Sequence, residues 1–265
     1  MNPTSKSIPQ PHLKAPGDPF MSKIASLAVI IPVFNEAENV LALLDEIETA
    51  LWGAAFPWKV IFIDDGSRDG TGERLKKAKG EHPALQVVRL KENCGQSAAT
   101  WTGVKAAQTQ LILTLDGDGQ NDRADIPKLV HQWETHSSEG PPLLVAGIRA
   151  QRRDSFLRRL SSRIANAVRA GILKDGTPDT GCSLKLFSRE NFLSFPFFDH
   201  MHRFIPALHV RAGGKIILVP VNHRPRQKGV SKYGVSNRLW VGLVDLFGVL
   251  WLSRRNKNPV IEYEE

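Results

Sequence analysis

Short apolar runs alternate with amphipathic stretches along the first half of the chain. The runs lie within residues 26–36, 58–63, 85–90 and 111–115. Each is too short for a typical helix, and its continuous apolar character is typical of a parallel strand that is buried on both faces. After the first run, apolar residues recur at helical spacing, namely Val40, Leu43, Leu44 and Ile47. Strands that alternate with helices predict an α/β fold with a mostly parallel central sheet, in which ligands bind outside the carboxyl ends of the strands.

A long apolar helix is predicted near the end of the chain, at residues 237–255. Its apolar stretch, residues 239–252, would be roughly 21 Å long at helical rise, short of the ~30 Å hydrocarbon core of a bilayer, and Asp245 interrupts it. Trp240 and Trp251 near its ends, with flanking arginines, are typical of a membrane interface. We therefore expect an amphipathic helix that lies on a membrane or docks to a membrane-embedded partner. Packing on the protein's own core is the alternative.

The fourth apolar run ends in the sequence Asp116-Gly117-Asp118. Residues two apart in an extended chain point the same way, so the two carboxylates can face one point. Converged carboxylates repel each other unless a cation lies between them, and hard divalent cations prefer oxygen ligands. The pattern favours a metal-diphosphate site, with Gly117 allowing a ligand to approach the backbone. A calcium loop is excluded because its sixth and twelfth positions would be Asn121 and Pro127, whereas a simple strand-to-turn ending remains the alternative.

Composition and charge narrow the class of protein. With 265 residues, of which 42% are hydrophobic, the chain is long enough for one large α/β domain or two small ones. Its 35 Lys and Arg against 27 Asp and Glu give a formal net charge of +8, which favours an anionic partner such as a phosphorylated substrate, an acidic membrane surface or a nucleic acid. Cys94 and Cys182 make neither a disulfide framework nor a zinc site, which fits a reducing compartment.

Four motifs follow one another along the chain, each at or near the end of a predicted strand. They are Pro32-Val-Phe-Asn-Glu36, Ile63-Asp-Asp-Gly-Ser-Arg-Asp-Gly-Thr71, Gly95-Gln-Ser-Ala-Ala99 and Asp116-Gly-Asp-Gly-Gln120. In this order and spacing they resemble the family-two inverting glycosyltransferases of the GT-A fold. More narrowly, they are similar to the polyprenyl-phosphate sugar synthases, the group of the dolichol-phosphate mannosyltransferases and their bacterial undecaprenyl-phosphate relatives. The resemblance covers residues 26–235 and implies a Rossmann-like sandwich.

The resemblance also implies how a nucleoside-diphosphate sugar would be held. Asp116 and Asp118 would act in catalysis by holding the diphosphate and, together with Gln120, a metal ion. Mg²⁺ or Mn²⁺ is implied as the cofactor, because the leaving group gains negative charge as the glycosidic bond breaks. The remaining nucleotide-sugar contacts would come from Pro32, Phe34, Glu36, Asp65 and Gln96.

Arginines gather between residues 149 and 163, where six of them stand against one acid, Asp154. Apolar residues at helical spacing over 156–164 predict an amphipathic basic helix there. Guanidinium groups chelate phosphate, so anion binding is favoured over a merely solvated helix face. The resemblance implies that Arg149, Arg158 and Ser162 bind a lipid phosphate. The segment has neither interleaved aromatics nor a known nucleic-acid module, so no nucleic-acid partner is expected.

Asp179 precedes a further apolar strand and is the third candidate catalytic residue. In related enzymes that attack with a sugar hydroxyl, a carboxylate near this position is the general base. A phosphate acceptor needs less help, because the second pKa of a phosphate monoester is about 6. We therefore expect Asp179 to orient the site more than to remove a proton.

A basic, glycine-bearing loop is predicted at residues 223–234, after an apolar strand at residues 215–221. It resembles the family's mobile loop that closes on the nucleotide diphosphate. Arg224, Arg226 and Lys232 are therefore candidates for neutralising the leaving group, and closure would exclude water. Upstream of this loop, His200 and His202 lie in an aromatic segment, where packing and hydrogen bonding near the acceptor groove are favoured over metal ligation.

The sequence thus predicts a polar, disordered leader at residues 1–23, a GT-A catalytic domain at 24–235 and an amphipathic interfacial helix with a tail at 236–265. We expect a peripheral enzyme at the cytoplasmic face of a membrane that transfers a hexose-type sugar, with inversion, from a nucleoside diphosphate to a polyprenyl phosphate. The product would be a lipid-linked sugar donor for the cell envelope. Transfer to a glycan hydroxyl and a non-catalytic scaffold for a membrane partner are the alternatives. The sequence identifies neither the sugar, the base and the lipid length nor the oligomeric state.

Overall fold

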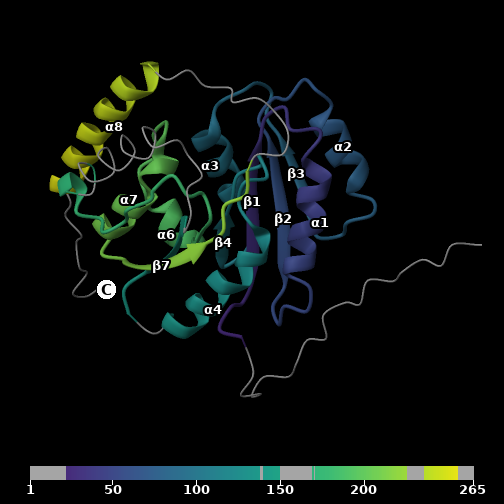
Figure 1. Cartoon of the computed structure of the whole chain (residues 1–265), viewed down its shortest axis with the longest axis horizontal. Coiled ribbons are helices and arrows are strands. Elements are labelled where there is room, and N and C mark those ends of the chain that lie inside the picture. Colours follow the sequence, from purple (N-terminus) through teal and green to yellow (C-terminus); the bar gives the residue numbers. More distant parts are fainter. Residues whose placement is uncertain (1–21, 138–139, 150–168, 170, 226–235, 256–265) are drawn as a thin grey trace, which may run out of the picture.

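Seven strands form one sheet (Figure 1) in a computed structural model that describes residues 22–137, 140–149, 169, 171–225 and 236–255. The strands are β1 Leu27–Val33, β2 Trp58–Asp64, β3 Leu85–Arg89, β4 Leu111–Thr114, β5 Leu143–Arg149, β6 Lys185–Ser188 and β7 Lys215–Val221. Their order across the sheet is β3-β2-β1-β4-β6-β5-β7. Among these strands only β6 is antiparallel to its neighbours β4 and β5, and all other pairings are parallel. The predicted α/β fold with a mostly parallel sheet is confirmed.

Helices cover both faces of this sheet (Figure 1). One face is packed by α1 Val40–Ala50, α2 Thr71–Ala78 and α4 Ile126–His136. The other face is packed by α3 Gln96–Ala106, α6 Arg189–Leu193 and α7 Ile205–Arg211, and α8 Ser236–Arg254 packs against α7. Two short 3-10 helices, η1 Arg123–Asp125 and η2 Met201–Arg203, lie in the connections.

The central strand β1 shows why the apolar runs lack polar alternation. Leu27, Val29 and Ile31 belong to the core under α1, α2 and α4, whereas Ala28 and Ile30 belong to the core under α3. Because successive side chains of a strand point to opposite faces, a strand covered by helices on both sides needs apolar residues at every position. The stripe predicted for the first helix is also confirmed, since its buried residues are Val40, Leu43, Leu44 and Ile47.

The last helix, α8, agrees with the predicted helix to within one residue at each end. Leu246 and Val249 are buried in the core that α8 shares with α7. This side of the helix therefore packs on the protein's own core, which was the alternative to a membrane contact. On the other side, Val244, Phe247 and Trp251 are 69%, 64% and 61% exposed. Within the described part of the chain, no helix has both the length and the apolar character needed to span a bilayer.

The direction of the strands brings distant parts of the chain to one edge of the sheet. The loops after β1, β2 and β4, which carry three of the four motifs, leave the sheet at this edge, together with the loops after β5 and β7. Because β6 is reversed, the residues that precede it, 179–184, lie at this same edge. We call it the carboxyl edge.

Candidate functional site

The first two motifs are joined by hydrogen bonds at the carboxyl edge. The backbone N–H of Asn35 donates to Ser67 Oγ over 2.9 Å, and that of Glu36 donates to Thr71 Oγ1 over 3.0 Å. Asn35 has a φ of 52°, a left-handed conformation that an L-residue seldom adopts. The loop after β2 therefore fixes a sharp bend directly after β1. Pro32, Phe34 and Glu36, the predicted nucleotide contacts of this bend, are all partly buried.

Asp65 connects the second motif to the third. Its side chain is only 3% exposed, and its two carboxylate oxygens accept hydrogen bonds from the backbone N–H groups of Cys94 over 2.8 Å and Gly95 over 2.9 Å. Gly95 itself has a φ of 88° and precedes α3 directly. The residue predicted to contact the nucleoside thus also sets the path of the chain into α3.

Gln96, the first residue of α3, connects the third motif to the fourth. Its side-chain amide donates to Asp116 Oδ1 over 2.7 Å. Both residues were predicted to contact the nucleotide sugar, and this bond directly joins side chains of two different motifs. It brings the amino end of α3 against the two carboxylates that follow β4.

The turn that carries Asp116 and Asp118 is held by polar groups from before β6. Ser183 Oγ accepts a hydrogen bond from the backbone N–H of Asp116 over 3.1 Å and donates to Asn121 Oδ1 over 2.8 Å. Asp118 Oδ1 accepts from the backbone N–H of Gln120 over 3.1 Å, which closes the turn. All three predicted metal-site residues therefore lie in one hydrogen-bonded turn at the carboxyl edge.

The electrostatics of this turn fit a divalent cation. Burial and then the neighbouring charge of Asp118 raise the pKa of Asp116 to about 6. A neighbouring carboxylate makes a carboxyl group harder to ionise. A cation bound between the two stabilises the ionised form of both. Oxygen donors of this kind suit Mg²⁺ and Mn²⁺.

Gly117 has a packing role in this turn. A Cβ atom at this position would lie 2.5 Å from Val33 Cγ1 and 3.1 Å from the carbonyl oxygen of Pro32. The glycine is therefore required by the close packing of the turn against the end of β1. The space in the direction of a Cβ is filled by the end of β1.

Arg149 and Asp179, predicted as an acceptor contact and a catalytic residue, form an ion pair with each other. Arg149 Nε donates to one carboxylate oxygen of Asp179, and a terminal nitrogen of Arg149 donates to the other. Both distances are 2.7 Å. The backbone N–H of Arg149 adds a third bond over 3.2 Å. Asp179 is 6% exposed, and this bidentate pair fixes the plane of the guanidinium group at the end of β5.

Lys185 was not singled out from the sequence. It is 3% exposed, and its ammonium group donates to the carbonyl oxygens of Cys182 and, over 3.4 Å, Thr180. Burial lowers its pKa, while the negative charges of nearby acids, including Asp116 and Asp179, act in the opposite direction. A buried cation thus lies within electrostatic reach of Asp116 and Asp179, two of the three predicted catalytic acids. A lysine inside a short apolar strand was the only signal that could have indicated it.

Arg224 reaches the turn through its backbone, but its guanidinium group is engaged elsewhere. Its N–H donates to the carbonyl oxygen of Gln120 over 2.8 Å. The guanidinium group donates to Glu46 over 2.7 Å and to Asp122 over 2.6 Å. These two bonds use two of the five N–H donors of the guanidinium group. A second arginine, Arg123, was not predicted and supports the same turn by donating to the carbonyl oxygens of Gly119 and Asn121.

Four predicted site residues lie outside the described residues. They are Arg158 and Ser162 of the predicted acceptor helix, and Arg226 and Lys232 of the predicted mobile loop.

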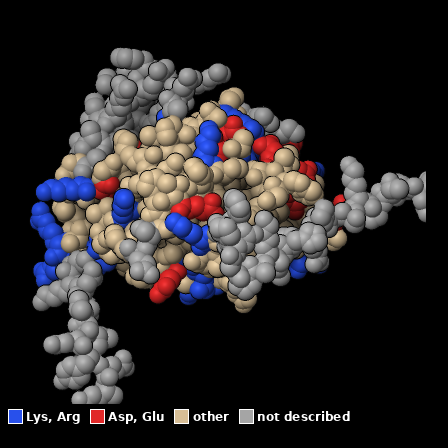
Figure 2. Space-filling model, turned by 90° about the horizontal axis from the view of Figure 1, so that it is seen from below, with Lys and Arg blue, Asp and Glu red and all other residues tan. Residues whose placement is uncertain are grey.

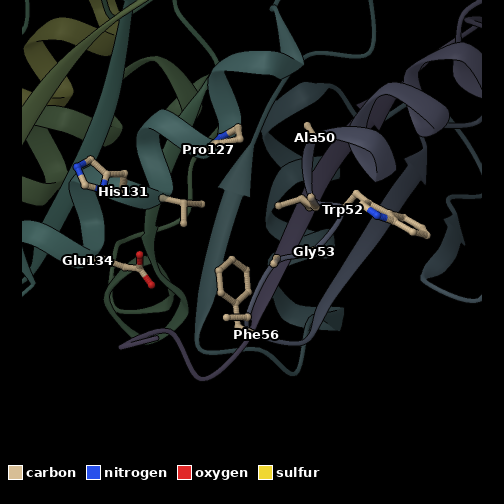
Figure 3. A pocket seen from close by; sticks show the side chains of 11 residues that line it. Ala50, Trp52, Gly53, Phe56, Pro127, His131 and Glu134 are labelled. Atoms are coloured by element: carbon tan, nitrogen blue, oxygen red, sulfur yellow. The ribbon is translucent and has the colours of Figure 1, made fainter. Parts of the chain in front are cut away.

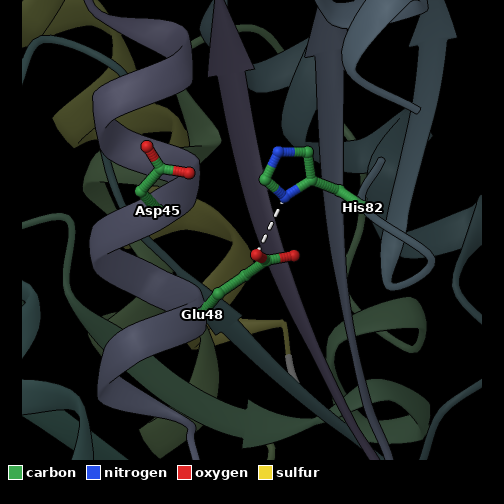
Figure 4. Close-up of side chains that lie close together, drawn as sticks. All are labelled: Asp45, Glu48 and His82. Atoms are coloured by element: carbon green, nitrogen blue, oxygen red, sulfur yellow. Dashed lines mark hydrogen bonds and ion pairs between the residues drawn. The ribbon is translucent and has the colours of Figure 1, made fainter. Parts of the chain in front are cut away.

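Two further features lie apart from this turn. A cavity of about 310 Å³ between the end of α1, the 51–56 loop and α4 is lined mainly by apolar residues, with His131 and Glu134 from α4 (Figure 3), and none of the predicted site residues lines it. Asp45 and Glu48 of α1 lie close to His82, whose Nδ1 is 2.8 Å from Glu48 Oε2 (Figure 4). This cluster could hold a metal ion, but it contains no residue of the four motifs.

Comparison with known proteins identifies related sequences. Residues 28–194 match the family described as glycosyl transferase family 2. A dodecaprenyl-phosphate galacturonate synthase of Rhizobium johnstonii is 36% identical over 251 residues, which are 93% of this chain and 72% of that protein. An undecaprenyl-phosphate 4-deoxy-4-formamido-L-arabinose transferase of Pectobacterium atrosepticum is 33% identical over 79% of this chain, and the match covers 63% of that protein.

Solved structures share the fold. Glucosyl-3-phosphoglycerate synthase from Mycobacterium tuberculosis, in complex with Mn²⁺, UDP-glucose and glycerol 3-phosphate, superimposes with a TM-score of 0.64 at 18% identity, covering 88% of this chain and 82% of that one. Mannosyl-3-phosphoglycerate synthase from Rubrobacter xylanophilus gives a TM-score of 0.63 at 17% identity, covering 91% and 79%. The predicted GT-A sandwich is thereby confirmed.

Proposed function

Because the chain belongs to glycosyl transferase family 2 and is a glycosyltransferase, we propose that it transfers a sugar from a nucleoside diphosphate to a polyprenyl phosphate with inversion at the anomeric carbon. The donor half of the proposal is carried by the bond between Gln96 and Asp116, which joins the motifs into one site. The acceptor half is supported by two relatives that are named for a polyprenyl phosphate. Their alignments cover 93% and 79% of this chain.

In this proposal the donor lies across the carboxyl edge. The bend at Pro32, Phe34 and Glu36 and the buried Asp65 form the nucleoside end of the site. Asp116, Asp118 and Gln120 would hold Mg²⁺ or Mn²⁺, which, when bound, offsets the charge that develops on the departing diphosphate. Arg224, Arg226 and Lys232 are the proposed basic contacts from the segment after β7, where Arg224 also pairs with Glu46 and Asp122.

The acceptor phosphate is placed by Arg149, whose guanidinium plane is set by Asp179. Arg158 and Ser162 are proposed to complete this contact. A phosphate oxygen attacks the anomeric carbon as the bond from that carbon to the diphosphate oxygen breaks. The attacking oxygen is already anionic near neutral pH, so the reaction needs no base to remove a proton.

The affinity for Mn²⁺ is expected to fall as the pH drops below about 6. The raised pKa of Asp116, about 6, means that the metal must displace a proton from this carboxyl at lower pH. Affinity should be nearly constant above pH 7 and should fall by about tenfold per pH unit well below pH 6. Titration of Mn²⁺ into the protein between pH 5 and pH 8, followed by the electron paramagnetic resonance signal of the free ion, measures this. An affinity that stays constant down to pH 5 would contradict it.

We further propose that α8 lies on the membrane that holds the acceptor, at the cytoplasmic face. The exposed apolar residues Val244, Phe247 and Trp251 support this, as do Arg254 and Arg255 at the end of the helix. On the face seen in Figure 2, basic and acidic side chains are interspersed over much of the described surface, with basic side chains gathered at one end.

Replacing Phe247 and Trp251 together by serine should weaken binding to vesicles that contain anionic lipid by about 100-fold or more, since burying two such side chains is worth about 3–6 kcal/mol. Co-sedimentation measures the bound fraction. Trp52→Ser is the matched control, because Trp52 is 66% exposed but lies on the loop after α1. Equal binding by both variants would exclude α8 as the membrane contact.

The direct test of the function is transfer of label to lipid. Purified protein, Mn²⁺ and undecaprenyl phosphate are incubated with radiolabelled sugar nucleotides, including UDP-glucose and the activated forms of galacturonate and 4-deoxy-4-formamido-arabinose. Label in the organic phase, dependent on the lipid phosphate, is the expected result. Label on an added glycan and none on lipid would favour the hydroxyl acceptor. Binding of a sugar nucleotide without turnover on any acceptor would favour the non-catalytic scaffold.

A further inference from the structure

The first turn of α3 carries two side chains with different partners. Gln96 donates to Asp116 over 2.7 Å, whereas the next residue, Ser97, is 1% exposed and bonds to His202 of η2. Ser97 Oγ accepts a hydrogen bond from the backbone N–H of His202 over 3.2 Å and lies 2.7 Å from its Nδ1. His202 is 105 positions away in the sequence, so this contact joins two separate elements.

The imidazole of His202 is uncharged. Burial, with the positive charges of Arg203 and Lys185, lowers its pKa to about 3. An uncharged Nδ1 can accept the proton of the Ser97 hydroxyl, whose oxygen already accepts the backbone N–H of His202. The pair is therefore a reciprocal two-bond contact between Ser97 and His202.

No side-chain cap fixes the start of α3. The residue before the helix is Gly95, which makes no capping hydrogen bond and has a φ of 88°. The first turn is instead held from one side by Asp65, which accepts from the N–H of Gly95, and from the other by His202.

The segment that supplies His202 is itself anchored. His200 has a left-handed φ of 61°, and its Nδ1 lies 3.2 Å from Asp245 Oδ2 of α8. Asp245 is the charged residue that interrupts the apolar stretch of this helix. The short helix η2 thus lies between α8 and the amino end of α3, with a polar contact to each.

We propose that His202 is a positioning residue for the donor site, which holds the first turn of α3 through Ser97 so that Gln96 keeps the carboxylate of Asp116 oriented toward the metal and diphosphate. The inference rests on the proposed function for the identity of the donor. Groups that orient a metal ligand from behind it commonly change metal affinity or activity by about 10- to 100-fold when they are removed.

His209 offers a matched control. Like that of His202, its pKa is lowered by burial, and it is hydrogen-bonded to Asn191 over 2.6 Å and to the carbonyl oxygen of Pro142 over 3.0 Å. It lies on α7 and contacts no residue of the four motifs through these bonds. Loss of His209 should therefore disturb the fold without reaching the donor site.

The experiment compares Ser97→Ala, His202→Ala and His209→Ala by two measurements, the melting temperature and the affinity for Mn²⁺ alone, read from the signal of the free ion. We expect the first two variants to bind Mn²⁺ about 10- to 100-fold more weakly, and His209→Ala to bind it as the unaltered chain does even where its melting temperature falls. His202→Gln, which keeps a neutral hydrogen-bonding group, should recover part of the affinity.

Unchanged Mn²⁺ affinity in Ser97→Ala and His202→Ala would overturn the inference, as would an equal loss in His209→Ala. The measurement needs no lipid, so failure to find a polyprenyl acceptor leaves its result intact. If the unaltered chain binds no Mn²⁺ while label still reaches the lipid, the positioning role is wrong and the transferase function stands.

Discussion

Replacing Asp118 by asparagine is expected to lower the rate of sugar transfer by about 100- to 1000-fold, because the change removes one of the two charges proposed to hold the metal at the diphosphate. The variant keeps an oxygen that can accept the N–H of Gln120, so the turn itself should persist. Steady-state transfer at saturating Mn²⁺ measures the effect. The loss should appear in kcat and not only in the Mn²⁺ requirement, since the charge acts on the developing diphosphate.

Asp45→Asn is the control for this experiment. Asp45 is an exposed acid of the cluster with Glu48 and His82, the other group in the described part of the chain that could hold a metal ion. The control should leave transfer unchanged. If Asp45→Asn removed activity and Asp118→Asn did not, the metal site would have been assigned to the wrong acids.

The second large effect is expected at the ion pair of Arg149 and Asp179. Asp179→Asn and Arg149→Lys should each lower kcat/KM for the polyprenyl phosphate by about 100-fold, because either change breaks the bidentate contact that sets the guanidinium plane. The double variant should be little worse than each single variant, since both single changes remove the same oriented group. Transfer rates over a range of lipid phosphate concentrations give the three values.

The pH dependence separates an orienting carboxylate from a general base. If Asp179 orients Arg149, the rate of Asp179→Asn is lowered by a similar factor at every pH at which the protein is folded. A general base would leave its own ionisation in the pH profile of the unaltered chain, and this step would disappear in the variant. Asp175→Asn serves as a control, because it breaks another buried pair, with Arg169, and should lower stability without raising KM for the lipid. Independent, multiplying effects of the Arg149 and Asp179 changes would contradict the account.

The sheet and its helices could be predicted because burial on both faces leaves a plain pattern. β1 needs apolar residues at every position, and α1 needs them at helical spacing, so both patterns are visible in the chain itself. The reversed direction of β6 was not predictable, since a strand of four residues carries no local mark of its direction. That reversal is what brings Ser183 to the backbone of Asp116.

The sequence was enough to predict which residues belong to the candidate site, but not which of them contact one another. Asp116 and Asp118 stand out because two acids follow an apolar run. The pairing of Arg149 with Asp179, 30 positions apart, depends on how β5 and the segment before β6 meet, and nothing in either local sequence indicates it. The support of α3 by His202 has the same origin, because only the folded chain brings η2 to Ser97.

We propose that Asp116 and Asp118 hold a divalent cation at the carboxyl edge, and the donor site depends on this cation. Crystals of the protein grown with Mn²⁺ and UDP, measured for anomalous scattering at the manganese absorption edge, test it most directly. An anomalous peak is expected at the turn of Asp116, Asp118 and Gln120, beside the diphosphate. A peak at Asp45, Glu48 and His82 with none at this turn would contradict it.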